Sequence, residues 1–220
     1  MKNEIVNTLK NFDTATLSDA LDSLNIKGAL LGIKPQIDKA DLCGLAFTVS
    51  YRIANSEDKK IKKAANFIDK VPEGFVPILS NQGRNDCTVW GDILTEVAIK
   101  RNISGTIIDG LCRDIKFITE SKYNMFSKGV FMQSGKGRTV MNEINVPVNI
   151  GEVRVLPGDY VRADRNGVVI IPAGNIDEVI DRADKINNTE NLIRTSIKKG
   201  SSLADARTKY NYNHAWEGEA

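Results

Sequence analysis

Residues 91–120 read GDILTEVAIKRNISGTIIDGLCRDIKFITE, and this stretch decides the fold class. Apolar residues recur at helical spacing between Gly91 and Arg101, which predicts a helix. The short apolar run from Gly105 to Ile108 predicts a buried strand that ends at Asp109-Gly110. A second helix is expected to begin at Ile115. Helix, strand and helix in immediate succession are typical of an α/β protein.

The same alternation extends outward from this stretch. Residues 44–51 alternate large apolar and smaller side chains, the period-two pattern of a half-buried strand. Residues 75–79 and 124–131 predict two further strands, the first in spite of Pro77. We therefore expect a mixed sheet flanked by helices.

Helical segments are expected at both ends of the chain. Residues 16–19 have the form of a capping box and predict a short amphipathic helix that ends before Gly28. Turn signals separate short strands between residues 146 and 172, and Asn175 is placed to cap a helix that continues to Gly200. Without repeats or a low-complexity linker, residues 1–220 are expected to form one domain, with helical segments at about 1–28 and 175–210.

Composition excludes several classes of protein. Thirty basic and 28 acidic residues leave a net charge of +2, and no long block of either sign suggests a nucleic-acid or lipid surface. Cys43, Cys87 and Cys112 are widely spaced and are expected to be buried, reduced thiols. No apolar run approaches the roughly 18 residues of a membrane span. We expect a soluble, cytoplasmic protein without membrane or direct nucleic-acid partners.

Two familiar kinds of catalytic site are disfavoured. The one histidine, His214, is the seventh residue from the end, where fraying is expected, so a Ser-His-Asp or Cys-His mechanism is disfavoured. A phosphate-binding loop is missing, and Gly135-Lys136-Gly137 is interpreted as a surface turn.

The candidate site combines Asp92 with Arg113 and Asp114, and twenty residues separate Asp92 from Arg113. Asp92 begins the predicted helix, while Arg113-Asp114 follow the predicted strand, at the end where α/β sheets bind ligands. An arginine fork suits the carboxylate or keto oxygen of a 2-oxo acid, and a carboxylate suits a hard divalent cation. The amides of Ile93 and Leu94 would add donors for the anion. From spacing alone, a helix cap and a surface ion pair remain the plainer alternative.

Motifs along most of the chain resemble a known family, which includes 4-hydroxy-4-methyl-2-oxoglutarate aldolase and the RraA-like regulators of ribonuclease activity. The aldolases of this family share an Asp, twenty residues and then Arg-Asp, which matches Asp92, Arg113 and Asp114. The other landmarks are TLSDAL at 16–21, GLAFTV at 44–49, WGD at 90–92, GTIIDG at 105–110, PGD at 157–159, ADRNGV at 163–168 and GSSL at 200–203.

The resemblance implies a fold, an assembly and a role for each site residue. The fold would be a swivelling β/β/α type, assembled as trimers or hexamers with active sites between subunits. Asp114 would bind Mg²⁺ or Mn²⁺, Arg113 would contact the pyruvate moiety, and Asp92 would help to order metal-bound water. The backbone around Gly91, Ile93 and Leu94 would hold the substrate carboxylate. Glu190 is the candidate for a contribution from the adjoining subunit, although a solvent-facing helix residue is the plainer interpretation.

We therefore expect a metal-dependent lyase acting on small 2-oxo acids. Retro-aldol cleavage of 4-hydroxy-4-methyl-2-oxoglutarate-type substrates and decarboxylation of oxaloacetate both release a pyruvate enolate, so one site can serve both. The alternative is an RraA-like regulator that binds a ribonuclease or an RNA helicase without catalysis. Such regulators tend to carry acidic residues after Arg-Asp, whereas Ile115, Lys116 and Phe117 follow here, which favours the enzyme.

Overall fold

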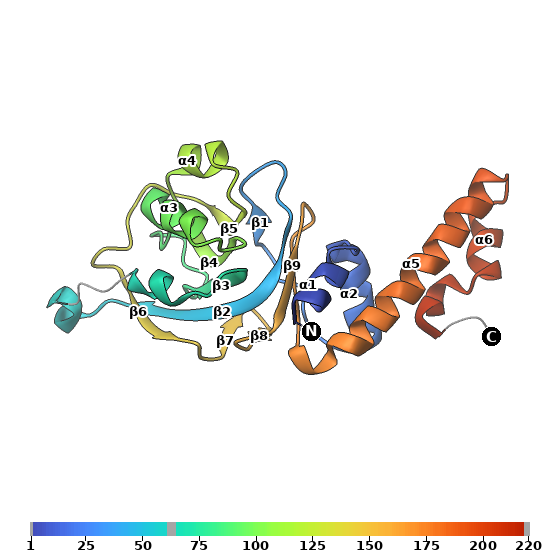
Figure 1. Cartoon of the computed structure of the whole chain (residues 1–220), viewed down its shortest axis with the longest axis horizontal. Helices are drawn as coiled ribbons and strands as arrows, with labels where there is room; N and C mark the ends of the chain where they lie inside the picture. Colours follow the sequence, from blue (N-terminus) through green and yellow to red (C-terminus); the bar gives the residue numbers. More distant parts are fainter. Residues whose placement is uncertain (1, 61–64, 218–220) are drawn as a thin grey trace.

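A computed structural model of the chain describes residues 2–60 and 65–217. Its centre is a strongly curved, nearly closed mixed sheet, with short helices on one side and a long helical arm at one end (Figure 1). Strand order is β1-β5-β4-β3-β2-β9-β10, with β6 also paired to β2. The strands are β1 (Lys34–Pro35), β2 (Leu42–Ile53), β3 (Phe75–Ser80), β4 (Thr106–Cys112), β5 (Met125–Val130), β6 (Thr139–Ile144), β9 (Tyr160–Ala163) and β10 (Val168–Ile171). This confirms the expected mixed α/β fold.

Strands β2 to β5 run parallel, so their carboxyl ends meet at one edge of the sheet. Antiparallel β6, β9 and β10 complete the sheet, and a separate hairpin of β7 (Val148–Ile150) and β8 (Val153–Val155) packs against β2 and β3. The helices are α1 (Lys2–Leu9), α2 (Thr14–Ser23), α3 (Asp92–Lys100), α4 (Ile115–Glu120), α5 (Ile176–Lys198) and α6 (Leu203–Lys209). Short 3-10 helices are η1 (Ser56–Lys60), η2 (Asn66–Lys70), η3 (Ala173–Asn175) and η4 (Tyr212–Glu217).

Apolar side chains of the strands form separate clusters on the two faces of the sheet. In β3, Val76 and Ile78 face the cluster enclosed by the β7–β8 hairpin, whereas Leu79 faces the cluster beneath α3 and α4. A third cluster joins α1, α2 and the first half of α5 to β9 and β10. Successive side chains of a strand point to opposite faces of the sheet, and here they are apolar on both faces. Both faces of this sheet are therefore buried.

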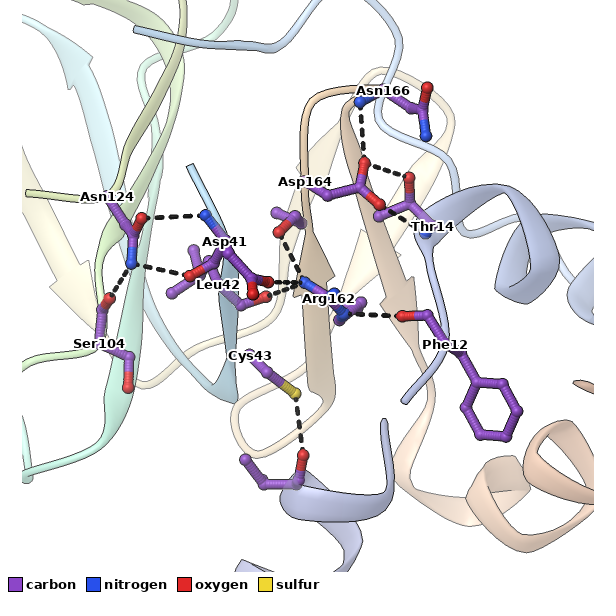
Figure 2. Close-up of polar contacts among 12 residues, drawn as sticks. Phe12, Thr14, Asp41, Leu42, Cys43, Ser104, Asn124, Arg162, Asp164 and Asn166 are labelled. Carbon is purple, nitrogen blue, oxygen red and sulfur yellow. Dashed lines mark hydrogen bonds and ion pairs between the residues drawn. The ribbon is translucent and has the colours of Figure 1, made fainter. Parts of the chain in front are cut away.

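Buried polar contacts fasten the N-terminal helices to the sheet, as Figure 2 shows. Arg162 on β9 is 6% exposed, and its guanidinium donates to the backbone oxygens of Phe12 at 3.0 Å and Leu42 at 3.3 Å. It also forms an ion pair with Asp41. Without the Arg162 side chain, these buried carbonyls would lose a hydrogen-bond partner, which costs free energy. Arg162 therefore holds the α1–α2 connection against β2.

The start of α2 differs from the capping box expected at Thr16. The helix begins at Thr14, and the side chain of Asp13 accepts a hydrogen bond from the Thr16 amide at 2.8 Å. Asp13 has the extended backbone of an N-cap, whereas Thr16 already lies in the first turn. The helix expected from Asn175 does begin there as α5, but the Asn175 side chain makes no cap bond, since η3 leads directly into the helix.

Strand β4 is longer than expected. The sequence predicted that it ends at Asp109-Gly110, whereas β4 continues through both residues to Cys112. A shift of register against β5 accommodates both residues, and Asp109, 3% exposed, forms an ion pair with Lys128 at 2.7 Å. An acidic side chain that normally marks a turn is thus neutralised within the sheet. Strand β6 was not expected from the sequence.

The outer half of α5 extends away from the sheet with α6 beside it, and together they form a C-terminal arm (Figure 1). Val179, Ala183 and Ile186 bury the inner half of α5 against α2 and the strands. Within the described part of the chain, no helix combines the length and apolar character needed to cross a bilayer.

Candidate functional site

The start of α3 and the end of β4 lie side by side, although twenty residues separate Asp92 from Arg113. The Arg113 amide donates to the Trp90 carbonyl at 3.0 Å, and the Asp92 amide donates to Oδ2 of Asp114 at 3.1 Å. Oδ2 of Asp114 also lies 3.4 Å from Nε of Arg113. The structure therefore brings the three sequence-predicted side chains together at the carboxyl edge of the parallel strands.

Asp114 adopts a left-handed backbone conformation, with φ 59° and ψ 39°. Aspartate tolerates this region better than most residues, and such conformations are concentrated at functional sites. The turn directs the carboxylate back over Gly91, where an added Cβ atom would lie 2.4 Å from Oδ2 of Asp114. Glycine at position 91 is therefore needed for the carboxylate to reach this place.

The first turn of α3 corrects one sequence-based expectation. The Ile93 amide, expected to be free for a substrate carboxylate, donates to Oδ1 of Asp92 at 2.7 Å. An anion would reach this amide only if the Asp92 side chain turned away. Asp92 is exposed and occupies the positive end of the helix dipole, which favours a carboxylate there.

A cavity of about 160 Å³ opens beside these residues. Pockets for drug-sized ligands measure roughly 300–1,000 Å³, so this one suits a small molecule. Its walls come from five segments of the chain. They are formed by Tyr51, Ala65, Thr88, Val89, Trp90, Gly91, Asp92, Ile93, Leu94, Arg113, Ser134, Gly135, Lys136 and Thr139.

Gly135 and Lys136 were expected in a surface turn without a role, but both line this cavity. Sequence reasoning missed them because 22 positions separate Lys136 from Asp114 and no local motif links the two segments. The turn is present as expected. What the sequence did not show is that it folds onto the wall of the site.

A buried aromatic platform supports the start of α3. The Trp90 indole donates to Oγ1 of Thr95 at 2.8 Å, and Thr95 Oγ1 lies 2.9 Å from the Gly91 carbonyl. The Trp90 ring stacks on Tyr123, with ring centres 6.0 Å apart and planes at 6°. Because Trp90 is 2% exposed, this packing limits the freedom of the adjacent Gly91-Asp92 backbone.

The donors present fit a divalent cation that keeps most of its water. Among residues 2–60 and 65–217 no group of three or more His, Cys, Asp or Glu side chains could hold a metal ion. Asp114 offers a half-exposed carboxylate, with Asp92 beside it. Mg²⁺ is commonly bound through one or two carboxylates, with waters completing its shell. A metal enclosed by protein ligands alone does not fit here.

Glu190 and the other residues considered in the sequence lie elsewhere. His214 lies in η4 against Trp216, with ring centres 5.8 Å apart, and does not line the cavity. Glu190 lies on α5, where it forms an ion pair with Arg194 and lines a different cavity together with Asp19. All three cysteines are buried and free, as expected, and burial raises the pKa of the Cys43 thiol to about 11.

Comparison with known proteins identifies the family. A family model described as RraA-like, Aldolase/RraA, matches residues 14–170.

The chain belongs to the RraA-like family.

Two relatives illustrate the range of RraA-like proteins that the chain resembles. Protein DlpA of Legionella pneumophila is 40% identical over 97% of this chain, but the match spans only 35% of DlpA. A Halalkalibacterium halodurans protein, provisionally named 4-hydroxy-4-methyl-2-oxoglutarate aldolase, is 30% identical over 83% of each chain.

Solved structures agree with the RraA-like fold. An uncharacterised protein from Pseudomonas syringae pv. tomato is 42% identical, covers 93% of this chain and 97% of its own, and superposes with a TM-score of 0.85. Streptomyces coelicolor RraAS2, described as an unusual member of the RNase ES inhibitor RraA protein family, gives a TM-score of 0.82. It is 24% identical over 88% of this chain and 98% of its own, so this likeness shows the fold alone.

Proposed function

We propose that the chain is a divalent-metal-dependent lyase that cleaves a carbon-carbon bond in small 2-oxo acids. Its reactions would be retro-aldol cleavage of 4-hydroxy-4-methyl-2-oxoglutarate-type substrates and decarboxylation of oxaloacetate. The observation that carries the proposal is the contact of Asp92, Arg113 and Asp114 beside a small cavity at the carboxyl edge of the sheet. The provisional name of the H. halodurans relative supports the same chemistry.

Each of the three side chains has a distinct task in this proposal. Arg113 binds the carboxylate or keto oxygen of the substrate through its planar guanidinium. Asp114 holds Mg²⁺ or Mn²⁺, and this ion, when bound, supplies the Lewis acidity that favours an enolate. The N-terminus of α3 would add the positive end of its dipole to the same anionic substrate once the Asp92 side chain turns away from the Ile93 amide.

Cleavage also needs a group that accepts the proton of the 4-hydroxyl. No histidine lines the cavity, whereas Asp92 does. Its carboxylate either takes this proton or positions the water that takes it. When the bond breaks, Arg113 lies where negative charge collects on the former keto oxygen, and its fixed charge lowers the barrier.

Pyruvate release from 4-hydroxy-4-methyl-2-oxoglutarate and from oxaloacetate tests the proposal. We expect turnover with Mg²⁺ or Mn²⁺, its loss with EDTA, and a reduction of about 10²-fold or more in Arg113→Ala and Asp114→Ala. Arg165→Ala, in an exposed turn, is the control and should retain wild-type rates. Wild-type turnover no greater than that of the free metal ion would refute a lyase acting on these substrates.

A binding protein without catalysis is the second candidate, because the fold is shared with S. coelicolor RraAS2. Stoichiometric capture of a ribonuclease or RNA helicase by the purified chain, combined with no metal-dependent turnover, would favour this candidate. The arrangement of Asp92, Arg113 and Asp114 has no evident purpose in such a protein, so we rank the lyase first.

A further inference from the structure

Two walls of the cavity are joined through one extended segment, which contains Thr88. Thr88 forms parallel bridges with Leu111 on one side and with Ser134 on the other. Neighbouring strands lie about 4.8 Å apart, so the two outer backbones stand about 10 Å apart at this level. Arg113 follows Leu111 by two residues, and Lys136 follows Ser134 by two. Both residues line the cavity between the walls.

The turn that carries Lys136 is held in place by many backbone contacts. The Gly135 carbonyl accepts hydrogen bonds from the amides of Arg138 and Thr139, each at 2.9 Å. The Arg138 guanidinium donates to the Ser134 carbonyl at 3.0 Å, and the Lys136 amide donates to Oγ of Ser134 at 3.2 Å. A preorganised turn of this kind reduces the entropy lost when its side chain binds a ligand.

Gly135 allows the turn to pack closely against Thr88, which also lines the cavity. A Cβ atom at this position would lie 2.6 Å from the Thr88 carbonyl oxygen, closer than real Cβ atoms come. The glycine that resembled part of a surface turn is therefore required for close packing against Thr88. This contact brings the next residue, Lys136, to the wall of the cavity.

Lys136 is available to bind an anion. Its side chain forms no ion pair with any acidic residue in the part of the chain that the structure describes. Arg113, by contrast, lies beside Asp114. The cavity thus has one cation next to the carboxylates of the lyase site and a second cation on the opposite wall. A molecule with an anionic group at each end fits this arrangement of charge.

We propose that Lys136 binds the second carboxylate of a 2-oxo dicarboxylic acid, the one remote from the 2-oxo group. This inference rests on the proposed function, because it assigns the 2-oxo end to Arg113 and Asp114. Lys136 would make the site specific for dicarboxylates over monocarboxylates of the same length. It would also favour retro-aldol cleavage over decarboxylation.

The preference between the two reactions follows from where negative charge moves. In the retro-aldol step the 4-hydroxyl loses its proton to a base, the C3–C4 bond breaks, and its electron pair forms the enolate of pyruvate. C4 becomes a ketone, and the remote carboxylate keeps its charge, so the contact with Lys136 persists in the transition state.

Decarboxylation of oxaloacetate places its electron pair on the same enolate, but the remote carboxylate itself departs as neutral CO₂. The negative charge that Lys136 binds therefore disappears in the transition state. An interaction that is stronger in the ground state than in the transition state slows the reaction. Lys136 thus holds the aldol substrate productively and opposes loss of CO₂.

Binding of two matched ligands tests this assignment without relying on turnover. Calorimetry with Mg²⁺ present would compare 2-oxoglutarate with 2-oxovalerate, which has the same chain length but lacks the second carboxylate. We expect the wild type to prefer 2-oxoglutarate by about tenfold or more, as one favourable charge pair predicts. Lys136→Ala should reduce the preference to within about twofold and leave 2-oxovalerate affinity unchanged, while Lys136→Arg should retain the preference.

Lys100→Ala, at the far end of α3, is the matched control and should bind as the wild type does. An unchanged preference in Lys136→Ala would overturn the proposal, and an equal loss of both ligands would show instead that Lys136 only maintains the turn. Turnover provides a second readout: Lys136→Ala should reduce retro-aldol kcat/KM by about tenfold more than oxaloacetate decarboxylation. If the wild type cleaves neither substrate, the proposed function fails, whereas the binding preference still decides the role of Lys136.

Discussion

At the scale of single residues, the site depends on a contact between Gly91 and Asp114. Asp114 has a left-handed backbone, and its carboxylate occupies space that a side chain at position 91 would need. Gly91 itself is extended, with φ −156° and ψ −164°, so any residue could adopt its backbone. The requirement for glycine comes from the neighbouring carboxylate and not from backbone strain.

Gly91→Ala should therefore inactivate the site without unfolding the protein. The added methyl group would stand 2.4 Å from Oδ2 of Asp114 and displace this carboxylate. Because a misplacement of about 1 Å can cost 10²-fold, we expect kcat/KM to fall by about that factor. Steady-state kinetics with Mg²⁺ measures the loss. Gly174→Ala, where nothing lies within 4 Å of the added atom, is the control, and equal rates in both variants would contradict this account.

At the scale of elements, polar side chains tie the N-terminal helices to the sheet. Asp164, in the β9–β10 turn, accepts hydrogen bonds from the Thr14 amide at 2.8 Å and the Thr14 hydroxyl at 2.7 Å (Figure 2). The Asn166 amide donates to it as well, at 2.8 Å. Burial acts to raise the pKa of Asp164, but these hydrogen bonds together outweigh it and hold the pKa below its ordinary value.

Asp164 should make stability depend on pH in the acidic range. A carboxyl group with a lowered folded-state pKa stabilises the protein above its unfolded pKa of about 3.9. This stabilisation is lost as pH falls through the lower folded-state pKa. We expect Asp164→Asn to cost about 1 kcal/mol at pH 7 and to flatten the pH dependence of unfolding between about pH 5 and pH 2.

Urea denaturation at a series of pH values measures this effect. Asp38→Asn, at an exposed position, controls for the loss of one negative charge and should leave the pH dependence unchanged. If the free energy of unfolding changes with pH in the same way in the wild type and in Asp164→Asn, the hydrogen bonds to Thr14 do not make stability depend on pH.

At the scale of the whole molecule, the C-terminal arm lies at one end of the long axis, whereas α3 and α4 lie toward the other end (Figure 1). Glu190 belongs to the arm and does not line the cavity of its own chain. Its expected contribution to a site therefore requires a second copy. The homo-oligomer, a trimer or a hexamer, remains a prediction that light scattering of the purified protein can test.

Mixing subunits tests whether Glu190 completes the site of a neighbour. Arg113→Ala and Glu190→Ala should each have little activity alone, because each removes one half of a shared site. In randomly mixed oligomers about a quarter of the sites would contain both wild-type residues, so activity should return to about that level. Pyruvate release before and after refolding the two variants together measures it. If mixing restores nothing while Glu190→Ala alone is fully active, Glu190 is an ordinary helix residue.

The sequence alone determined most elements of the α/β core, and it indicated that Asp92 could lie near Arg113 and Asp114. Helical and strand periodicities are local, so the helices Asp92–Lys100 and Ile115–Glu120 and the first part of the strand Thr106–Cys112 could be recognised from nearby residues. The order helix, strand, helix then implied that the two parts of the motif meet at one edge of the sheet. The resemblance added the roles of these residues, which remain predictions.

Only the tertiary structure decided how the site is enclosed. The approach of Gly135 to Thr88, which brings Lys136 to the cavity, joins residues 47 positions apart and leaves no periodic signal. The left-handed residue Asp114 likewise accepts a hydrogen bond from the Asp92 amide, 22 positions earlier in the chain, which no local pattern indicates. Periodicity reports which face of an element is buried, whereas the chemistry of a cavity depends on which distant segments pack together.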